Sequence, residues 1–310
     1  MSTARHLPAF ANSTNVRLLF QTLARRATVR AAVSLAPSFA DAWAERLFLT
    51  PPRSNDLERA LHDLSDGRAA SLEHHGRRLA TWRWGPDEGP AIVLAHGWGG
   101  HAAQMRHFVY PLRSAGFRVI AFDQPAHGRS EGRLSGLPDF AAALAVVVQK
   151  TGDVRAVVAH SLGGPALAYA IANGVTIEAA VLVSPPSDLV GYSRRFAHWL
   201  GMPDWLRDAM QAAIEERFGV RWSAFELERL SPRLGGRALV IHDAGDRQVP
   251  IKQGRRIAQA WPGARLLETR GLGHARILSA DAVVRAAADF IAGRSQVAER
   301  AADLLPSPIY

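Results

Sequence analysis

A serine stands between small residues at positions 159–163, Ala-His-Ser-Leu-Gly, in a setting where it could act as a nucleophile. The residues before it, 154–158, include three valines, which are typical of a strand buried on both faces. Residues 165–172 are rich in alanine and leucine, which favour helix. A sharp strand-to-helix turn brings backbone close to the serine, so its neighbours must be small. The pattern predicts a nucleophile elbow at Ser161, with Ala159 in place of the usual glycine and with Gly164 letting the helix pack closely.

Carboxylates and imidazoles follow other predicted strands of the chain. Asp246 comes shortly after the apolar run 238–242, and His274 lies in a glycine-bounded loop after the run 264–268. In open α/β sheets, ligands bind outside the carboxyl ends of the strands. A serine hydroxyl needs a base to become a nucleophile, and an imidazole base needs a carboxylate that holds its tautomer. These residue types therefore predict nucleophilic attack by Ser161 with His274 as the base.

The elements that would position these residues alternate along the chain. Short apolar runs predict strands at 91–95, 118–122, 154–158, 179–183, 238–242 and 264–268, and residues 70–75 and 77–84 predict a β-hairpin. Helical patterns are found at 102–115, 137–150, 165–172, 254–261 and 280–291. This alternation predicts an α/β fold, a doubly wound, mostly parallel sheet with helices on both faces.

Two segments stand outside this alternation. Residues 185–236 separate two strands by more than a crossover needs and are rich in large apolar residues, which predicts an inserted helical cap. Residues 1–68 predict an N-terminal helical extension whose apolar stripe packs on the domain that follows, although a basic amphipathic helix could instead lie on a membrane. The core is then expected at 69–184 and 237–295, with a tail at 296–310.

The composition excludes several kinds of chemistry. The chain has no cysteine, which rules out disulfides, thiolate catalysis and cysteine zinc sites. Its net charge of +9 comes almost wholly from scattered arginines without a recognition motif, so we expect no binding of nucleic acid. No apolar run is long enough to span a membrane, and the first residues lack the pattern of a secretory signal. We therefore expect a cytoplasmic protein.

Taken together, the motifs resemble the α/β-hydrolase superfamily, in its small, cap-bearing, esterase-like branch. The resemblance covers residues 70–292, and the order Ser161, Asp246, His274 is similar to the family's order of nucleophile, acid and base. It implies that Asp246 is the acid that orients the base. Asp243, which stands where the family usually has glycine, and Asp188, at a position used by some related enzymes, are the alternatives.

The resemblance also implies an oxyanion hole, formed by the backbone N–H groups of Leu162 and Trp98. Residues 96–100, His-Gly-Trp-Gly-Gly, depart from the family's His-Gly-Gly-Gly and place one bulky side chain at the hole. Residues 122–130 resemble a family turn that is structural, with Ala126 in place of glycine. His160 is expected to point away from the nucleophile. The side chains expected to contact substrate are Trp98, Phe196, Trp199 and Trp205.

A serine nucleophile argues against the dehalogenases and epoxide hydrolases of this fold, which use aspartate. What remains is attack on an acyl carbonyl, and a carboxylester is the first expectation. A thioester, a lactone or a carbon–carbon bond beside a ketone would suit the same residues, and a non-catalytic binding protein that kept the fold is a further alternative. We expect a small acyl substrate as the partner, with neither a cofactor nor a metal.

Overall fold

The structure is a computed structural model that describes residues 26–29, 37–52 and 57–294. Its described residues form two compact units. One contains Leu49–Leu189 together with the chain from Val220 onward, and the other contains Val190–Gly219 together with the N-terminal segment that ends at Phe48. This division places residues 220–236 in the unit that holds the sheet, whereas the sequence assigns them to the cap. The predicted boundaries of core and cap stay a prediction.

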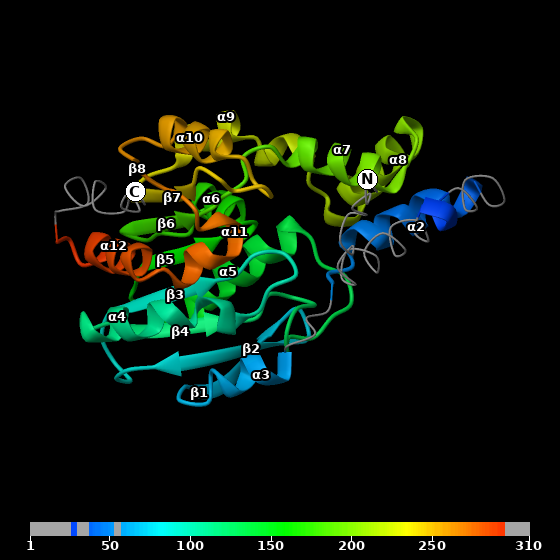
Figure 1. Ribbon diagram of the computed structural model, residues 1–310. Coiled ribbons are helices and arrows are strands. Elements are labelled where there is room, and N and C mark those ends of the chain that lie inside the picture. The colour runs from blue at the N-terminus through cyan, green and yellow to red at the C-terminus, as the bar shows by residue number, and fades with distance from the viewer. Residues whose placement is uncertain (1–25, 30–36, 53–56, 295–310) are drawn as a thin grey trace, which may run out of the picture. The chain divides into compact units, whose positions relative to one another are not determined.

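The larger unit is built on a single eight-stranded sheet. Its strands are β1 (Arg68–His74), β2 (Arg77–Trp84), β3 (Ala91–Ala95), β4 (Arg118–Phe122), β5 (Val154–His160), β6 (Ala179–Val183), β7 (Arg237–Asp243) and β8 (Arg265–Thr269). They lie side by side in the order β1-β2-β4-β3-β5-β6-β7-β8 (Figure 1). The hairpin β1–β2 joins β4 in antiparallel pairing, and every pairing from β4 to β8 is parallel. The predicted fold class is confirmed.

Helices cover both faces of the sheet because strand side chains alternate between them. One face carries η1 (Ala102–Phe108), α4 (Val109–Ser114), η4 (Ile277–Ser279) and α12 (Asp281–Ile291), with α3 (Leu57–His62) beside them. The other carries α5 (Leu137–Thr151), α6 (Gly163–Ala172), α9 (Leu227–Leu230) and α10 (Ile251–Ala260). The remaining short helices of this unit are η2 (Trp222–Phe225), η3 (Ser231–Arg233) and α11 (Gly273–Arg276).

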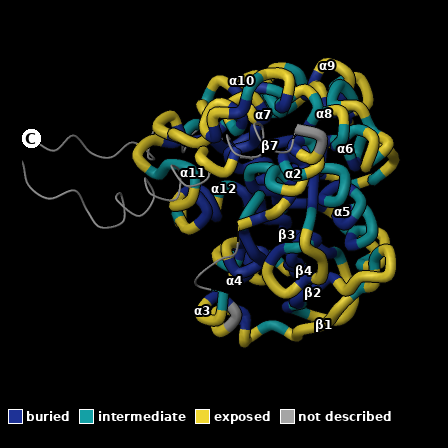
Figure 2. Tube along the Cα trace, turned by 90° about the vertical axis from the view of Figure 1, so that its right-hand side faces the viewer, coloured by how far each residue is buried: buried dark blue, intermediate teal, exposed yellow. Residues whose placement is uncertain are grey.

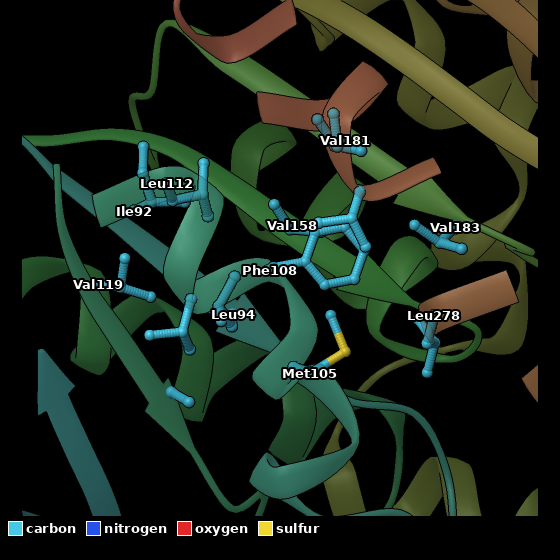
Figure 3. Packing of buried hydrophobic residues seen from close by; sticks show 14 of the residues in the cluster. Ile92, Leu94, Met105, Phe108, Leu112, Val119, Val158, Val181, Val183 and Leu278 are labelled. Atoms are coloured by element: carbon cyan, nitrogen blue, oxygen red, sulfur yellow. The ribbon is translucent and has the colours of Figure 1, made fainter. Parts of the chain in front are cut away.

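The core under the first face shows why the central strands are apolar throughout. Phe108 and Met105 of η1 pack on alternate residues of β3, β5 and β6, among them Leu94, Val158 and Val181 (Figure 3). All five side chains are fully buried. The edge strand β1 is by contrast largely exposed, whereas the central strands are buried along their length (Figure 2). Two covered faces fix the strand ends rigidly, and those ends carry the residues singled out in the sequence.

Two predicted helices differ from the observed ones. The helix expected at 102–115 is a 3₁₀ stretch, η1, followed by the short helix α4. Pro111 has no N–H to donate to the carbonyl of His107, so one continuous α-helix cannot form there. The helix expected from Gly254 begins three residues earlier, at Ile251. Position 254 lies inside this helix and requires glycine, because a Cβ there would stand 2.3 Å from Nδ1 of the buried His242.

The smaller unit contains α2 (Pro37–Leu49), α7 (Leu189–Leu200), α8 (Asp204–Phe218) and the helical residues 26–29. Phe48 of α2 packs edge-on against Tyr192 and Phe196 of α7, with ring centroids 6.0 and 5.0 Å apart. Glu45 of α2 forms an ion pair with Arg217 of α8. Helix α2 of the N-terminal extension therefore packs with helices of the predicted cap.

The apolar stripe predicted for the N-terminal extension consists of Val16, Leu19, Phe20, Leu23 and Ala27, and the first four of these lie outside the described residues. In the part of the chain that is described, no helix is both long and apolar enough to cross a membrane.

Candidate active site

Ser161 occupies a strained turn directly after β5. Its φ of 50° lies in the left-handed region, which a non-glycine residue adopts at a cost of about 1–3 kcal/mol. The turn is held by a hydrogen bond from the Ser161 N–H to the carbonyl of Val183, 2.9 Å away on β6. Close packing requires the glycines that follow: a Cβ on Gly163 would lie 3.0 Å from the carbonyl oxygen of His96, and one on Gly164 would lie 2.8 Å from Cβ of Pro185. The elbow is thus formed as the sequence predicts.

His274 and Asp246 meet Ser161 at the carboxyl ends of the strands. Nε2 of His274 lies 3.0 Å from Oγ of Ser161, and Nδ1 of the same ring lies 2.7 Å from Oδ2 of Asp246. A carboxylate only accepts hydrogen bonds, so the proton of the neutral ring sits on Nδ1 and leaves Nε2 free to accept from the serine hydroxyl. The structure therefore brings together the three residues named from the sequence, in the geometry of a proton relay.

Asp246 is fixed in place as a carboxylate. Its Oδ1 accepts the backbone N–H groups of Gln248 and Val249 at 2.8 and 2.9 Å. Burial raises the pKa of this carboxyl, but the nearby His242 ring and the hydrogen bonds from His274 and the backbone outweigh burial and hold the pKa well below its usual range. His242, fully buried, has Nε2 2.8 Å from the carbonyl of Val249 and 3.6 Å from Oδ2 of the aspartate. The surrounding residues therefore keep Asp246 ionised and fix its orientation.

Asp243, the nearest competitor for the role of the acid, does different work. Its Oδ2 accepts the hydroxyl of Thr269 at 2.9 Å and the N–H of Leu272 at 3.0 Å, while Oδ1 accepts the N–H of Gly245 at 2.9 Å. These donors belong to the end of β8 and to the two loops that carry the acid and the base. Asp243 therefore ties these loops to the end of β7, whereas the His274 ring is hydrogen-bonded to Asp246.

Asp188, the other alternative, follows β6, where its backbone N–H donates to Oε1 of Gln253 at 3.1 Å. Among the described residues, the carboxylate bonded to the His274 ring is that of Asp246.

His160 contacts the loop that contains His274. The prediction that its side chain points away from that of Ser161 stays a prediction. Its ring packs against that of His274, with centroids 4.8 Å apart, and its Nε2 lies 3.0 Å from the His274 carbonyl oxygen. Strand alternation offered a signal, because it puts His160 on the same face of β5 as Val158. The sequence does not show that the loop containing His274 covers that face.

The loop after β3 supplies the other side of the site. A Cβ on Gly97 would lie 2.7 Å from Cβ of Ser161, so this loop passes directly beside the nucleophile. Within the described chain, no backbone hydrogen bond uses the N–H of Trp98 or of Leu162. The ring of Trp98 packs against His127, with centroids 5.1 Å apart. The side chain therefore has a packing role that does not depend on the role of its backbone N–H. The oxyanion hole expected from these two N–H groups stays a prediction.

The turn after β4 holds this loop. Asp123 accepts the N–H groups of Ala102 and Arg129, each at 2.7 Å, and burial raises its pKa to about 6. Nε2 of His127 accepts the N–H of Gly99 at 3.0 Å, and burial lowers the pKa of this ring to about 4. Ala126, with φ of 64°, adopts the left-handed conformation that glycine would take more easily. The segment is structural, as expected from the sequence.

The three predicted substrate contacts of the cap all lie in the smaller unit. Phe196 packs on Phe48, and the backbone carbonyl of Trp199 accepts a hydrogen bond of 2.8 Å from Nε of Arg26. The side chains of Trp199 and Trp205 are 40% and 49% exposed, which is unusual for indole rings. Their contact with substrate stays a prediction. Within the described ranges, no three His, Asp or Glu side chains are grouped as metal ligands.

Comparisons with known proteins agree with this architecture. A family model described as "alpha/beta hydrolase fold" matches residues 90–230. A bifunctional esterase/perhydrolase of Acinetobacter calcoaceticus is 39% identical over 114 residues, which cover 33% of this chain and 40% of that protein. The chain spans about two fifths of the length of the curated relatives that it matches first.

Two solved structures extend the likeness over most of the chain. An esterase of Pyrococcus furiosus superposes with a TM-score of 0.58 at 19% identity, covering 78% of this chain and 98% of that one. A membrane phospholipase A, described as a bacterial virulence factor, superposes with a TM-score of 0.59 at 16% identity, covering 90% and 99%. At these identities the likeness concerns the fold. Strand order, elbow and matched model agree, and the chain is a protein of the α/β-hydrolase fold.

Proposed function

We propose that this protein is a serine hydrolase that cleaves carboxylic esters through an acyl-enzyme intermediate. The observation that carries the proposal is the continuous pair of hydrogen bonds from Oγ of Ser161 through His274 to Asp246, at 3.0 and 2.7 Å. Serine is a weak nucleophile on its own, and a base in hydrogen-bond reach with its own orienting carboxylate is the arrangement that activates it. The strained elbow supports the same role, because it holds the hydroxyl in one place above the sheet.

The first half of the reaction forms the acyl-enzyme. Oγ of Ser161 attacks the ester carbonyl carbon as Nε2 of His274 takes the hydroxyl proton, and Asp246 stabilises the resulting imidazolium. The carbonyl oxygen becomes an oxyanion facing the N–H groups of Leu162 and Trp98, and donors of this kind typically contribute about 10²–10³ in turnover each. When the intermediate collapses, the bond to the alkoxy oxygen breaks and His274 gives its proton to the departing alcohol.

The second half repeats the chemistry with water. His274, neutral again, takes a proton from a water molecule as that water attacks the acyl carbon. Collapse of the second intermediate breaks the bond to Oγ, which regains its proton from the imidazolium, and the carboxylic acid leaves. Every proton moves through Nε2, so the tautomer set by Asp246 serves both halves.

The choice of an ester among acyl substrates draws on the relatives. The matched proteins include an esterase/perhydrolase and a monoacylglycerol lipase of Mycolicibacterium smegmatis, which are named for acyl esters. A thioester, a lactone or a carbon–carbon bond beside a ketone would use the same protons and remains an outcome of the assay. A small acyl substrate as the partner and a cytoplasmic location are parts of the same proposal.

Labelling with a fluorophosphonate probe, followed by a series of p-nitrophenyl esters of two to twelve carbons, tests the proposal. The probe phosphonylates only an activated serine, so the wild-type protein should be labelled and Ser161→Ala should not. Ser71→Ala, a substitution of an exposed serine on β1, is the matched control and should behave as wild type. Absence of labelling in the folded wild-type protein would favour a non-catalytic binding protein. Labelling without hydrolysis of any ester in the series would point to another acyl bond.

A further inference from the structure

The loop that carries the base has little structure of its own. His274 lies in α11, a helix of four residues, and two glycines with φ of 81° and 67°, Gly271 and Gly273, precede it. Glycine loses the most conformational freedom on ordering, so a short glycine-flanked loop is expected to sample several conformations unless other residues hold it. A displacement of the base by about 1 Å would cost about 10² in rate. The fixed position of His274 therefore needs a cause outside its loop.

Two buried side chains, at the ends of the two strands that flank β6, contact this loop. Asp243, at the end of β7, accepts the N–H of Leu272 at 3.0 Å and so holds the backbone before the base. His160, the last residue of β5, has Nε2 3.0 Å from the carbonyl oxygen of His274 itself. A carbonyl only accepts, so the imidazole donates from Nε2. The second contact fixes the very residue whose ring takes the proton.

The His160 ring also packs against a second ring, and its surroundings favour one tautomer. It packs against the His274 ring with centroids 4.8 Å apart and planes at 47°, and only 6% of the residue is exposed. Its Nδ1 is buried with no hydrogen-bond partner in the described chain, so a proton there would be a buried, unsatisfied donor. The titratable groups that act on this ring are His274, Asp246, His242 and His96. Burial first, and then the charge on His274, lower the pKa of His160 to about 3.

We propose that His160 is a positioning residue, which holds the base over the nucleophile by donating from Nε2 to the His274 carbonyl and by packing beneath its ring. It acts from the residue adjacent to Ser161, so one rigid strand end sets the positions of both the nucleophile and the base. The proposal rests on the proposed function, and it assigns to the neutral Nε2–H tautomer a task in catalysis that packing alone does not require.

Two variants separate the hydrogen bond from the ring. His160→Phe keeps an aromatic ring in the buried site and removes the donor, whereas His160→Gln keeps an N–H donor near the position of Nε2 and removes the ring. Val158→Ala is the matched control, because Val158 is buried on the same face of β5 two residues earlier and carries no hydrogen-bonding group. Steady-state kinetics on the best p-nitrophenyl ester give kcat and KM for each, with melting temperatures to compare stability.

We expect His160→Phe to lower kcat by about 10²-fold with KM little changed, because the loss concerns alignment of the base in the transition state. His160→Gln should recover about tenfold of that loss, one decade of the hydrogen bond's contribution. Val158→Ala should lower the melting temperature and leave kcat within about threefold, a factor worth less than 1 kcal/mol. Wild-type kcat in a folded His160→Phe protein, or equal losses in all three variants, would overturn the proposal.

A measurement on the wild-type protein keeps the inference testable if His160→Phe does not fold. Nitrogen-15 NMR of the histidine rings should show His160 as the Nε2–H tautomer, unchanged between pH 5 and 9, with an Nε2 proton slow to exchange. An Nδ1–H tautomer or a titration within that range would contradict it. If the wild-type protein neither labels nor turns over any ester while this tautomer is present, the proposed function fails and the contact stands. If the protein is active and the tautomer is absent, the positioning role alone fails.

Discussion

Replacing Asp246 by asparagine should inactivate the protein while leaving its fold intact, and the geometry dictates why. Oδ1 accepts two backbone N–H groups, from Gln248 and Val249, so the amide oxygen of an asparagine must occupy that position. The amide NH₂ then replaces Oδ2 and points at Nδ1 of His274, 2.7 Å away in the wild type. Two donors cannot face each other, so the ring turns to the tautomer that accepts at Nδ1 and carries its proton on Nε2.

An Nε2–H ring cannot take the proton of Ser161. The corresponding change in other serine triads lowers kcat by about 10⁴, which is about 5 kcal/mol in the barrier at about 1.4 kcal/mol per decade. Two of the four groups around the carboxylate, the backbone N–H donors, keep their acceptor, so we expect Asp246→Asn to remain folded. The assay is kcat/KM on a p-nitrophenyl ester over pH 5–10, with circular dichroism and a melting curve on the same sample.

Asp188→Asn is the control, since Asp188 is one of the two other carboxylates that the sequence leaves open and follows a different strand, β6. It should retain activity within about threefold, less than 1 kcal/mol in the barrier. A folded Asp246→Asn protein that loses less than about tenfold would refute the assignment of the acid, because no base in the wrong tautomer can work that well. A loss with Asp188→Asn instead would transfer the role to that residue.

Three further outcomes follow from the same geometry. Ser161→Ala should abolish ester turnover and fluorophosphonate labelling without unfolding the protein, as activity and circular dichroism together will show. Gly97→Ala should lower kcat by about 10², because the new Cβ would stand 2.7 Å from that of Ser161. An unchanged kcat would contradict this and would mean that the loop after β3 can move without displacing Ser161. Burial lowers the pKa of His127 to about 4 and that of His160 to about 3, while it raises that of Asp123 to about 6. Each histidine therefore contributes stability that is full above about pH 6.5 and is lost as the pH falls, and the buried His96, whose pKa is also lowered, acts in the same direction. The aspartate opposes one of them, so the free energy of unfolding measured in urea should drop between pH 6.5 and 4.5 by at least about 1.4 kcal/mol per pH unit; a constant free energy of unfolding would contradict this.

Much of the fold could be read from the sequence because both faces of the sheet are covered. A strand buried on both sides must be apolar along its whole length, and the runs at 91–95, 118–122 and 179–183 coincide with β3, β4 and β6. The elbow could also be predicted, since a sharp turn requires small neighbours and these are found within residues 159–163. The order of Asp246 and His274 along the chain gave the remaining two members, although only the structure shows their hydrogen bonds.

What the sequence did not give is which loop lies over which strand end. His160 and Ser161 are adjacent, and alternation alone sends their side chains apart, so the sequence favoured a bystander role for the histidine. The structure shows that the base reaches the serine from the very face on which His160 lies, so the carbonyl of His274 comes within 3.0 Å of its Nε2. The same limit applies to Asp243: its type and position fit the acid, and only the N–H groups of Gly245 and Leu272 show that its carboxylate is already committed. Residue type predicts what a side chain can do, but the role of a buried polar group depends on the partners that folding brings to it, and the partner of His160 lies 114 residues away along the chain.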